Sequence, residues 1–235
     1  MIALLIGLAG FLSGPSLHGL AVQAGADRDF HLGLTCPRCG DDGPTFSFRC
    51  TCSRARWREL ALGILVGLAC AGMARAVGFR PVLIAYLAMV LVTGVLIVTD
   101  LDHFRIPNRI LYPGTAICSA LLVVGATADP GRGSLIRGLA GAGIYFGLLL
   151  LVFVAARGEG FGLGDVKLAA LLGLFTAFEG YRILAWSLII TAVLGAIPAL
   201  VLLAMGKGRK ASLPYGPPLV LGAWSAIIFS STLLS

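Results

Sequence analysis

Pro81-Val-Leu-Ile-Ala-Tyr-Leu-Ala-Met-Val-Leu-Val-Thr-Gly-Val-Leu-Ile-Val-Thr99 is an uncharged, mostly apolar run, and Asp100 follows it directly. A helix of about 20 such residues crosses the hydrocarbon core of a bilayer. The run therefore predicts a transmembrane helix that ends beside Asp100. A carboxylate at the edge of a membrane helix is energetically costly, which makes Asp100 a candidate functional residue.

The rest of the chain repeats this pattern. Of its 235 residues, 58% are hydrophobic and only 12% are charged, whereas soluble domains carry about 25% charged residues. A soluble globular protein is therefore excluded, and we predict an all-α polytopic membrane protein with about eight transmembrane helices. The expected spans are 1–22, 59–77, 81–99, 109–128, 135–156, 166–178, 181–205 and 215–234. This divides the chain into a first helix (1–22), a polar insert (23–58) and a seven-helix core (59–235).

Basic residues predict the orientation of these helices. Thirteen of the 18 lysines and arginines fall in cytoplasmic loops if the N-terminus lies outside the cell, as the positive-inside rule requires. No lysine or arginine precedes Arg28, so we read the first span as a retained helix rather than a signal peptide. Anionic lipid beside the cytoplasmic loops accounts for the net charge of +7 without any nucleic acid.

A second carboxylate, Asp165, closes the glycine-rich stretch Gly162-Leu-Gly-Asp165 and precedes another apolar run. We expect Asp165 at or near the N-cap of the helix that follows, where it could serve only as a cap. The predicted topology, however, puts Asp100 and Asp165 on the same, cytoplasmic side. Two neighbouring carboxylates can share one proton and activate a water molecule, which is the chemistry of an aspartyl protease.

Asp102 is the alternative to Asp100. Pro107 disfavours helix at Ile106, so the third span should end near Asp100. Asp102 lies two residues further toward water, where a solvated carboxylate is the default reading. Residue chemistry alone gives Asp100 only a modest preference.

The polar insert holds four cysteines in two close pairs, Cys36-Pro-Arg-Cys39 and Cys50-Thr-Cys52. Four thiolates in this arrangement suit a tetrahedral, structural zinc site, which would stabilise a segment too small to bury a core. Two disulfides are the alternative, and a reducing cytoplasm argues against them.

Several motifs together resemble the type IV prepilin peptidases, which are membrane aspartyl proteases with a Gly-x-Gly-Asp signature. They are Phe161-Gly-Leu-Gly-Asp-Val-Lys-Leu168, the Asp100-Leu-Asp-His segment with Pro107-Asn108, Pro214-Tyr-Gly-Pro217, and the cysteine insert after the first span. The resemblance covers nearly the whole chain and implies that Asp100 and Asp165 are the catalytic pair, in preference to Asp102. Because glycine lets the backbone turn sharply and come close to a ligand, we expect Gly162 and Gly164 to form a turn that supports Asp165.

The resemblance further implies a function: removal of the leader from prepilins or pseudopilins, after a glycine, at the cytoplasmic face of a bacterial inner membrane. Many members also N-methylate the product with S-adenosylmethionine. The N-terminal region departs from the family here, because Gly10-Phe-Leu-Ser-Gly-Pro-Ser-Leu-His18 lacks the usual asparagine, although Glu59 matches. The sequence therefore predicts peptidase activity more directly than methylation. It does not identify the particular substrate or the oligomeric state.

Other polar residues have simpler interpretations. Lys167 either tunes the aspartate pair or extends to the membrane interface, and Arg105 and Arg109 are expected to contact lipid headgroups. His18 has no evident partner in the sequence. A proton- or cation-coupled transporter that uses the same aspartates is the alternative function, and a non-catalytic zinc-bearing scaffold is a further one.

Overall fold

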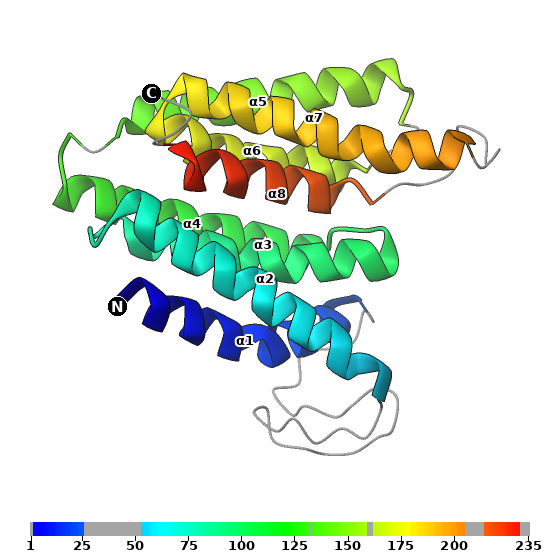
Figure 1. Ribbon diagram of the computed structural model, residues 1–235. Helices are drawn as coiled ribbons and strands as arrows, with labels where there is room; N and C mark the ends of the chain where they lie inside the picture. The colour runs from blue at the N-terminus through cyan, green and yellow to red at the C-terminus, as the bar shows by residue number, and fades with distance from the viewer. Residues whose placement is uncertain (1, 26–52, 132, 159–161, 205–213, 231–235) are drawn as a thin grey trace.

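The computed structural model describes residues 2–25, 53–131, 133–158, 162–204 and 214–230, and within these ranges the chain is helical, with no strand. The helices run roughly side by side as a bundle (Figure 1). Their bounds are α1 Ile2–Gly25, α2 Ser53–Val77, α3 Leu83–His103, α4 Asn108–Ala128, α5 Leu135–Ala155, α6 Leu163–Glu179, α7 Tyr181–Ala204 and α8 Gly216–Ile228. The predicted all-α fold is confirmed.

Helices α1 to α5 each contain a segment long and apolar enough to cross a bilayer. Helices α7 and α8 contribute shorter apolar stretches, and α6 has 17 residues. Large side chains such as Leu4, Leu68 and Ile136 are exposed on the outer surface, where lipid tails rather than water are the solvent. The chain is therefore a polytopic membrane protein.

The second helix begins earlier than the sequence predicted. We expected it to start at residue 59, after a loop that included Arg54, Arg56 and Arg58, whereas α2 starts at Ser53. Arginine is a good helix former, so a run of arginines is compatible with an extra helical turn and a half before the apolar stretch. The remaining part of the predicted insert, residues 26–52, lies outside the described residues.

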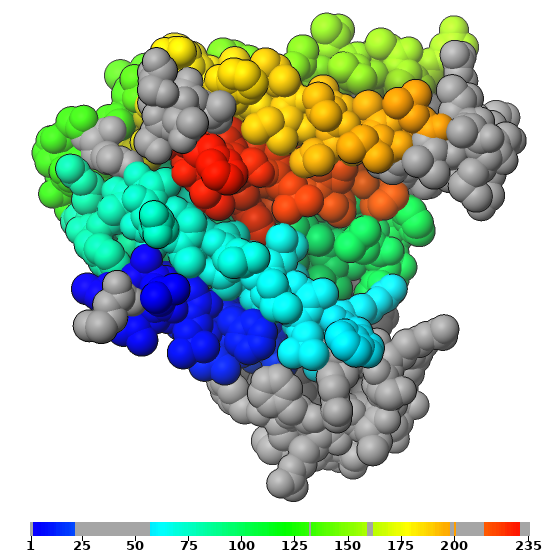
Figure 2. Space-filling view, viewed as in Figure 1, coloured from blue at the N-terminus to red at the C-terminus, as the bar shows by residue number. Residues whose placement is uncertain are grey.

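The bundle has two groups of helices that meet along α8. In one group α1 lies against α2 and α3 against α4, and in the other α5 lies against α6 and α7 against α8. Helix α8 also contacts α2, α3 and α6. In the space-filling view α8 lies between α7 and α2 on the visible face (Figure 2). The site described below lies between the two groups.

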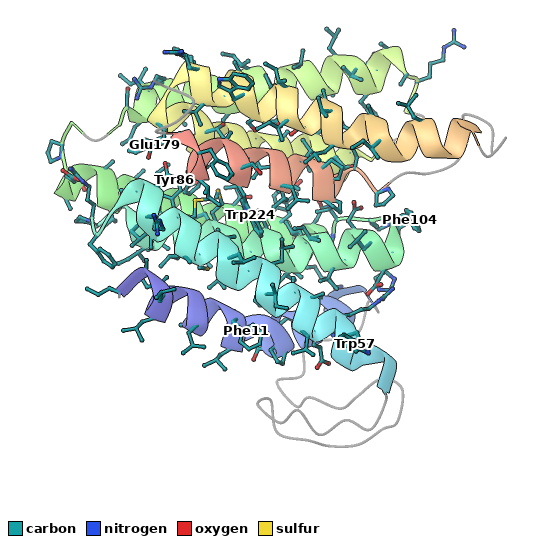
Figure 3. The ribbon with its side chains drawn as sticks, viewed as in Figure 1. Phe11, Trp57, Tyr86, Phe104, Glu179 and Trp224 are labelled. Carbon is teal, nitrogen blue, oxygen red and sulfur yellow. The ribbon has the colours of Figure 1, made fainter. Side chains whose placement is uncertain are left out.

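Polar contacts mark the two ends of the bundle. At one end Arg58 of α2 pairs with Asp102 of α3, and Trp57 and Phe104 lie toward this end in Figure 3. At the other end the Tyr86 hydroxyl donates to Glu179 Oε1 at 2.8 Å (Figure 3). The beginning of α2 and the end of α3 therefore share one end, as the predicted topology requires.

Glycines allow α5 and α6 to approach closely. A Cβ atom at Gly141 would lie 2.8 Å from the carbonyl oxygen of Gly173 and would also collide with Ala177. Arg137 of α5 anchors the far end of α6, because its Nε donates to the Ala177 carbonyl at 2.9 Å and its Nη2 to that of Phe178 at 2.6 Å. These contacts fix α6, the helix whose first turn carries Asp165.

Candidate active site

Asp100 lies in the last turn of α3 and is buried, with 3% of its surface exposed. The helix ends at His103 because Phe104 adopts the left-handed conformation (φ 50°), from which its N–H donates to the Asp100 carbonyl at 2.8 Å. The chain is extended at Pro107 (φ −71°, ψ 126°) and re-enters helix at Asn108. The predicted break before Pro107 is therefore confirmed.

Asp165 lies in the first turn of α6, two residues after the helix begins at Leu163. It is thus the third helical residue rather than the N-cap, which is Gly162. Its Oδ2 accepts a hydrogen bond from the Gly162 N–H at 2.9 Å. Free N–H groups and the helix dipole favour a negative charge at this position.

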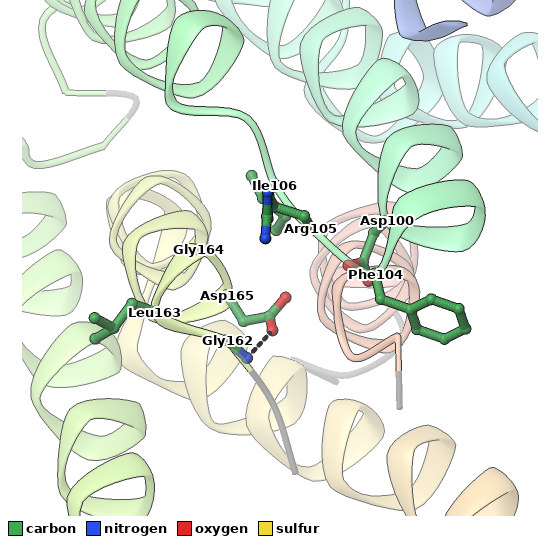
Figure 4. Close-up of a pocket in the computed structure, with 8 residues that line it drawn as sticks. All are labelled: Asp100, Phe104, Arg105, Ile106, Gly162, Leu163, Gly164 and Asp165. Atoms are coloured by element: carbon green, nitrogen blue, oxygen red, sulfur yellow. Dashed lines mark hydrogen bonds between the residues drawn. The ribbon is translucent and has the colours of Figure 1, made fainter. Parts of the chain in front are cut away.

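Both aspartates line one pocket, together with the loop that joins α3 to α4 and the beginning of α6 (Figure 4). Residues 65 positions apart in the sequence thus meet at one end of the bundle, as the span assignment predicted. Asp165 is also buried, and its Oδ1 has no hydrogen-bond partner within the described residues. One oxygen of Asp165 therefore caps the helix while the other has no partner among the described residues, so a capping role does not exclude a functional one.

Gly164 is the glycine of this turn whose size matters most. A Cβ atom there would lie 2.8 Å from the Cβ of Ile106, a buried residue of the α3–α4 loop. At Gly162 the nearest atom to an added Cβ is 3.8 Å away, and its φ of −93° is open to other residues. Gly164 therefore brings the two aspartate-bearing segments together, whereas Gly162 contributes a backbone N–H.

Asp102 is not part of the pocket. Its carboxylate pairs with Arg58 of α2, so it is less solvated than the sequence suggested. Nearby, Nδ1 of the buried His18 lies 3.9 Å from Oε1 of Glu59. Glu59 is thus a charged neighbour of His18 that sequence spacing does not reveal, but 3.9 Å is too long for a hydrogen bond, and Nε2 of His18 has no partner within the described residues.

Lys167 points to the beginning of α4. Its Nζ donates to Oδ1 of Asn108 at 3.1 Å and lies 5.1 Å from the centre of the Tyr112 ring. Neither role considered for Lys167 included this link between α6 and α4. Arg105, which is exposed, also contributes to the lining of the aspartate pocket.

The beginning of α8 contributes a part of the site that sequence reasoning missed. The Gly216 N–H donates to Asp100 Oδ2 at 2.9 Å. Tyr215, just before the helix, lies beside Gly195 of α7. The Pro214-Tyr-Gly-Pro217 motif was the only sequence signal for this contact.

The predicted zinc ligands Cys36, Cys39, Cys50 and Cys52 lie outside the described residues. Within the part of the chain that the structure describes, no cluster of three or more His, Cys, Asp or Glu side chains has an arrangement that could hold a metal ion. The aspartate pocket thus presents carboxylates without a further metal-ligating side chain from these residues. Carboxyl groups such as these can hold and transfer a proton.

Comparison with known proteins gives a consistent assignment. Residues 85–202 match the model of the type IV leader peptidase family, a range that contains both aspartates. The prepilin leader peptidase/N-methyltransferase of Stutzerimonas stutzeri is 30% identical over 149 residues, which cover 60% of this chain and 49% of the relative. The Pseudomonas putida protein of the same name is 28% identical over 211 residues, covering 83% and 71%.

The corresponding Bacillus subtilis protein is 29% identical over 170 residues, which cover 71% of this chain and 65% of the relative. The chain thus spans about half the length of the Stutzerimonas relative and about two thirds of the Bacillus one. No solved structure matches. The family match covers half of the chain and includes both halves of the pocket, so the chain belongs to the type IV leader peptidase family.

Proposed function

We propose that this protein is a membrane aspartyl endopeptidase that removes the leader peptide of type IV prepilins or pseudopilins. The observation that carries the proposal is the meeting of Asp100 and Asp165, from two different helices, in one pocket at an end of the bundle. Membership of the leader peptidase family supports the same activity. The enzyme would thus act on a peptide bond with two carboxylic acids.

The proposed mechanism divides the work between the two carboxyl groups. Two carboxyl groups that line one pocket would hold one proton between them, because both cannot easily be ionised. The ionised member accepts a proton from a water molecule, whose oxygen attacks the carbon of the scissile carbonyl. The protonated member donates a hydrogen bond to the carbonyl oxygen and stabilises the charge that develops there.

The proposed substrate is a protein with a short basic leader ahead of a hydrophobic helix. The relatives are named for prepilins, and a pocket at one end of a bundle of apolar helices suits a substrate that is itself held in the membrane. The leader would be cut on the cytoplasmic side of the bacterial inner membrane, with the N-terminus of the enzyme outside. The excess of basic residues in the corresponding loops supports this orientation.

We restrict the proposal to the peptidase. The names of the relatives include N-methyltransferase, whereas the first helix of this chain lacks the asparagine that the resemblance leads one to expect. S-adenosylmethionine is therefore not assigned a role here. The zinc site at Cys36, Cys39, Cys50 and Cys52 is proposed as a structural feature separate from the peptidase pocket.

The family match favours the peptidase over a proton- or cation-coupled transporter. The two functions also differ in where they require the aspartates to lie. A transporter needs a path through the bilayer with carboxylates along it, whereas a peptidase needs both carboxylates at one point. Asp100 and Asp165 lie in a single pocket at one end of the bundle, which supports the peptidase.

Co-expression with prepilins tests the proposal. The full chain would be expressed with a panel of prepilins, and the intact mass and N-terminal sequence of each product would be measured. We expect a product shortened after a glycine, and the additional mass of one methyl group would report methylation in the same experiment. A panel that remains unprocessed while a known family member processes it would contradict the proposal.

A further inference from the structure

Gly216, the first residue of α8, makes the backbone hydrogen bond that holds Asp100. Its N–H donates to Asp100 Oδ2 at 2.9 Å, and the two residues are 116 positions apart. Gly216 is buried, as is Asp100. The contact therefore joins the beginning of α8 to the end of α3, inside the protein and directly at the pocket.

The sequence at the beginning of α8 leaves one backbone N–H group available to bond Asp100. The first N–H groups of a helix have no partner within the helix. Here the second and third helical residues are Pro217 and Pro218, which have no N–H. The next N–H, that of Leu219, donates to the Tyr215 carbonyl at 3.2 Å. Among the first three residues of α8, Gly216 alone carries an N–H, and Asp100 receives it.

Glycine at this position leaves the space that the Asp100 carboxylate occupies. A Cβ atom at residue 216 would lie 2.8 Å from Asp100 Oδ2, 3.2 Å from its Cγ and 3.3 Å from its Cβ. The first of these distances is too short for a carbon beside a carboxylate oxygen, so any side chain would push the carboxylate away. The α8 dipole adds a favourable interaction with negative charge at its N-terminus.

The arrangement parallels that of Asp165. The Gly162 N–H at the beginning of α6 donates to Asp165 Oδ2 at 2.9 Å. Each aspartate thus has one oxygen held by the N–H of a glycine at the beginning of a helix. Holding one oxygen fixes the rotation of the carboxyl group and so determines where the other oxygen points.

We propose that Gly216 is a positioning residue of the active site, which orients Asp100 for reaction with Asp165 through its backbone N–H. The inference rests on the proposed peptidase function and extends it to the Pro214-Tyr-Gly-Pro-Pro218 segment. This segment is then the third component of the site, after the ends of α3 and α6. Gly216 acts through its hydrogen bond to Asp100.

The kinetic test compares Gly216→Ala with Gly147→Ala, each in the full chain, on a prepilin that the wild-type protein cleaves. An added Cβ at Gly147 meets nothing within 4 Å, so Gly147→Ala should match the wild type. The added methyl group should displace the Asp100 carboxylate from the Gly216 N–H. If the energy of this hydrogen bond to a charged group is lost from the transition state, kcat falls by about 10- to 100-fold. We expect this fall in Gly216→Ala, with KM little changed, because Gly216 is buried and the change acts on the orientation of Asp100.

The pH profile separates positioning from general damage. A backbone N–H that donates to a carboxylate favours its ionised form. Without that bond the acid limb of the kcat profile should move to higher pH in Gly216→Ala and stay in place in Gly147→Ala. A Gly216→Ala protein with wild-type kcat and an unmoved profile would overturn the proposal.

A double-mutant cycle of thermal stability tests the Gly216–Asp100 contact without any substrate. In detergent, Gly216→Ala should lower the midpoint of thermal unfolding. The same change should have little effect in an Asp100→Ala background, because the colliding carboxylate is gone. If Gly216→Ala lowered the unfolding midpoint equally in the wild-type protein and in the Asp100→Ala variant, the proposal would be overturned. This comparison remains valid when Gly216→Ala on its own is poorly stable. Should the wild-type protein cleave no prepilin, the proposed function would fail, while this cycle would still test the Gly216–Asp100 contact.

Discussion

Asp102 of α3 pairs with Arg58 of α2, while Asp100, two residues earlier, points into the pocket that Asp165 also lines. The two acids of the Asp-Leu-Asp segment therefore face different partners. One joins α2 to α3 at the surface, and the other takes part in the buried site. This difference in surroundings is consistent with the proposed catalytic role of Asp100 and not of Asp102.

Substitution of the three aspartates should give two clear classes. Asp100→Asn and Asp165→Asn should each lower prepilin cleavage by about 10²- to 10⁴-fold, because each removes a proton-transfer group. Asp102→Asn should keep cleavage and cost about 1 kcal/mol of stability or less, since the Arg58 side chain is largely exposed. The measurements are initial cleavage rate and thermal unfolding midpoint. Cleavage lost in Asp102→Asn but retained in Asp100→Asn would reverse our assignment.

Gly164→Ala should damage the site through packing alone. The added methyl group would approach the Ile106 Cβ to 2.8 Å, so the α3–α4 loop and the first turn of α6 must separate. A misplacement approaching 1 Å in an active site can cost about 100-fold in rate. We expect a large fall in kcat/KM for Gly164→Ala, measured with a prepilin substrate.

Gly143→Ala is the matched control for this substitution. Gly143 is exposed on α5, and an added Cβ meets nothing within 4 Å, so the same chemical change should leave kcat/KM near the wild-type value. If Gly164→Ala behaved like Gly143→Ala, the close approach of Gly164 to Ile106 would not control the geometry of the aspartates.

The link between Lys167 and Asn108 should contribute to stability more than to proton transfer. Lys167→Met and Asn108→Ala each remove the same hydrogen bond, and each should cost about 1 kcal/mol. The double variant should cost less than the sum of the two, because the shared interaction is lost only once. Thermal unfolding of the four proteins in detergent measures this coupling.

The pH dependence of cleavage distinguishes the alternative role of Lys167. If its charge tuned the aspartates, Lys167→Met would move the pH profile and Asn108→Ala would not. We expect neither variant to move it, because the side chain is directed to Asn108 and Tyr112. A shift confined to Lys167→Met would therefore show that the lysine acts on the aspartate pair.

Sequence patterns located the aspartates because each follows or precedes a long apolar run, and the edges of such runs are easily found. Pro107 located the break between α3 and α4 for an equally local reason. Gly216 was missed because its contribution is a backbone N–H, and no side chain marks which backbone group faces a distant carboxylate. The His18–Glu59 and Lys167–Asn108 contacts were missed for a related reason, since they depend on how two helices lie together.

Close packing of α5 on α6 should be sensitive to one methyl group at Gly141. An added Cβ there would collide with Ala177 and lie 2.8 Å from the Gly173 carbonyl oxygen. Overpacking of this kind costs about 1–3 kcal/mol, so Gly141→Ala should lower the thermal unfolding midpoint. Gly147→Ala, in the same helix but with open space around it, should not lower it. Equal midpoints for the two variants would contradict the close α5–α6 approach.

Metal analysis tests the zinc prediction for the four cysteines of the insert. The protein, purified under reducing conditions without added metal, should contain about one zinc ion per chain, as expected for a four-cysteine site. Cys36→Ser and Cys50→Ser should each reduce the zinc content, because each removes a thiolate from a different pair. Cys118→Ser, which alters a buried cysteine of α4, is the control and should retain the metal.

The same variants separate the zinc site from the peptidase site. Asp100 and Asp165 lie in the helical core, away in sequence from the cysteines, and the proposed reaction uses no metal ligand. Removal of zinc should therefore leave Asp100 and Asp165 able to cleave a prepilin, while it destabilises the insert. Thiol labelling of the unfolded protein without reductant gives a second measurement: four protected cysteines that become free only after reduction would indicate disulfides and contradict the zinc site.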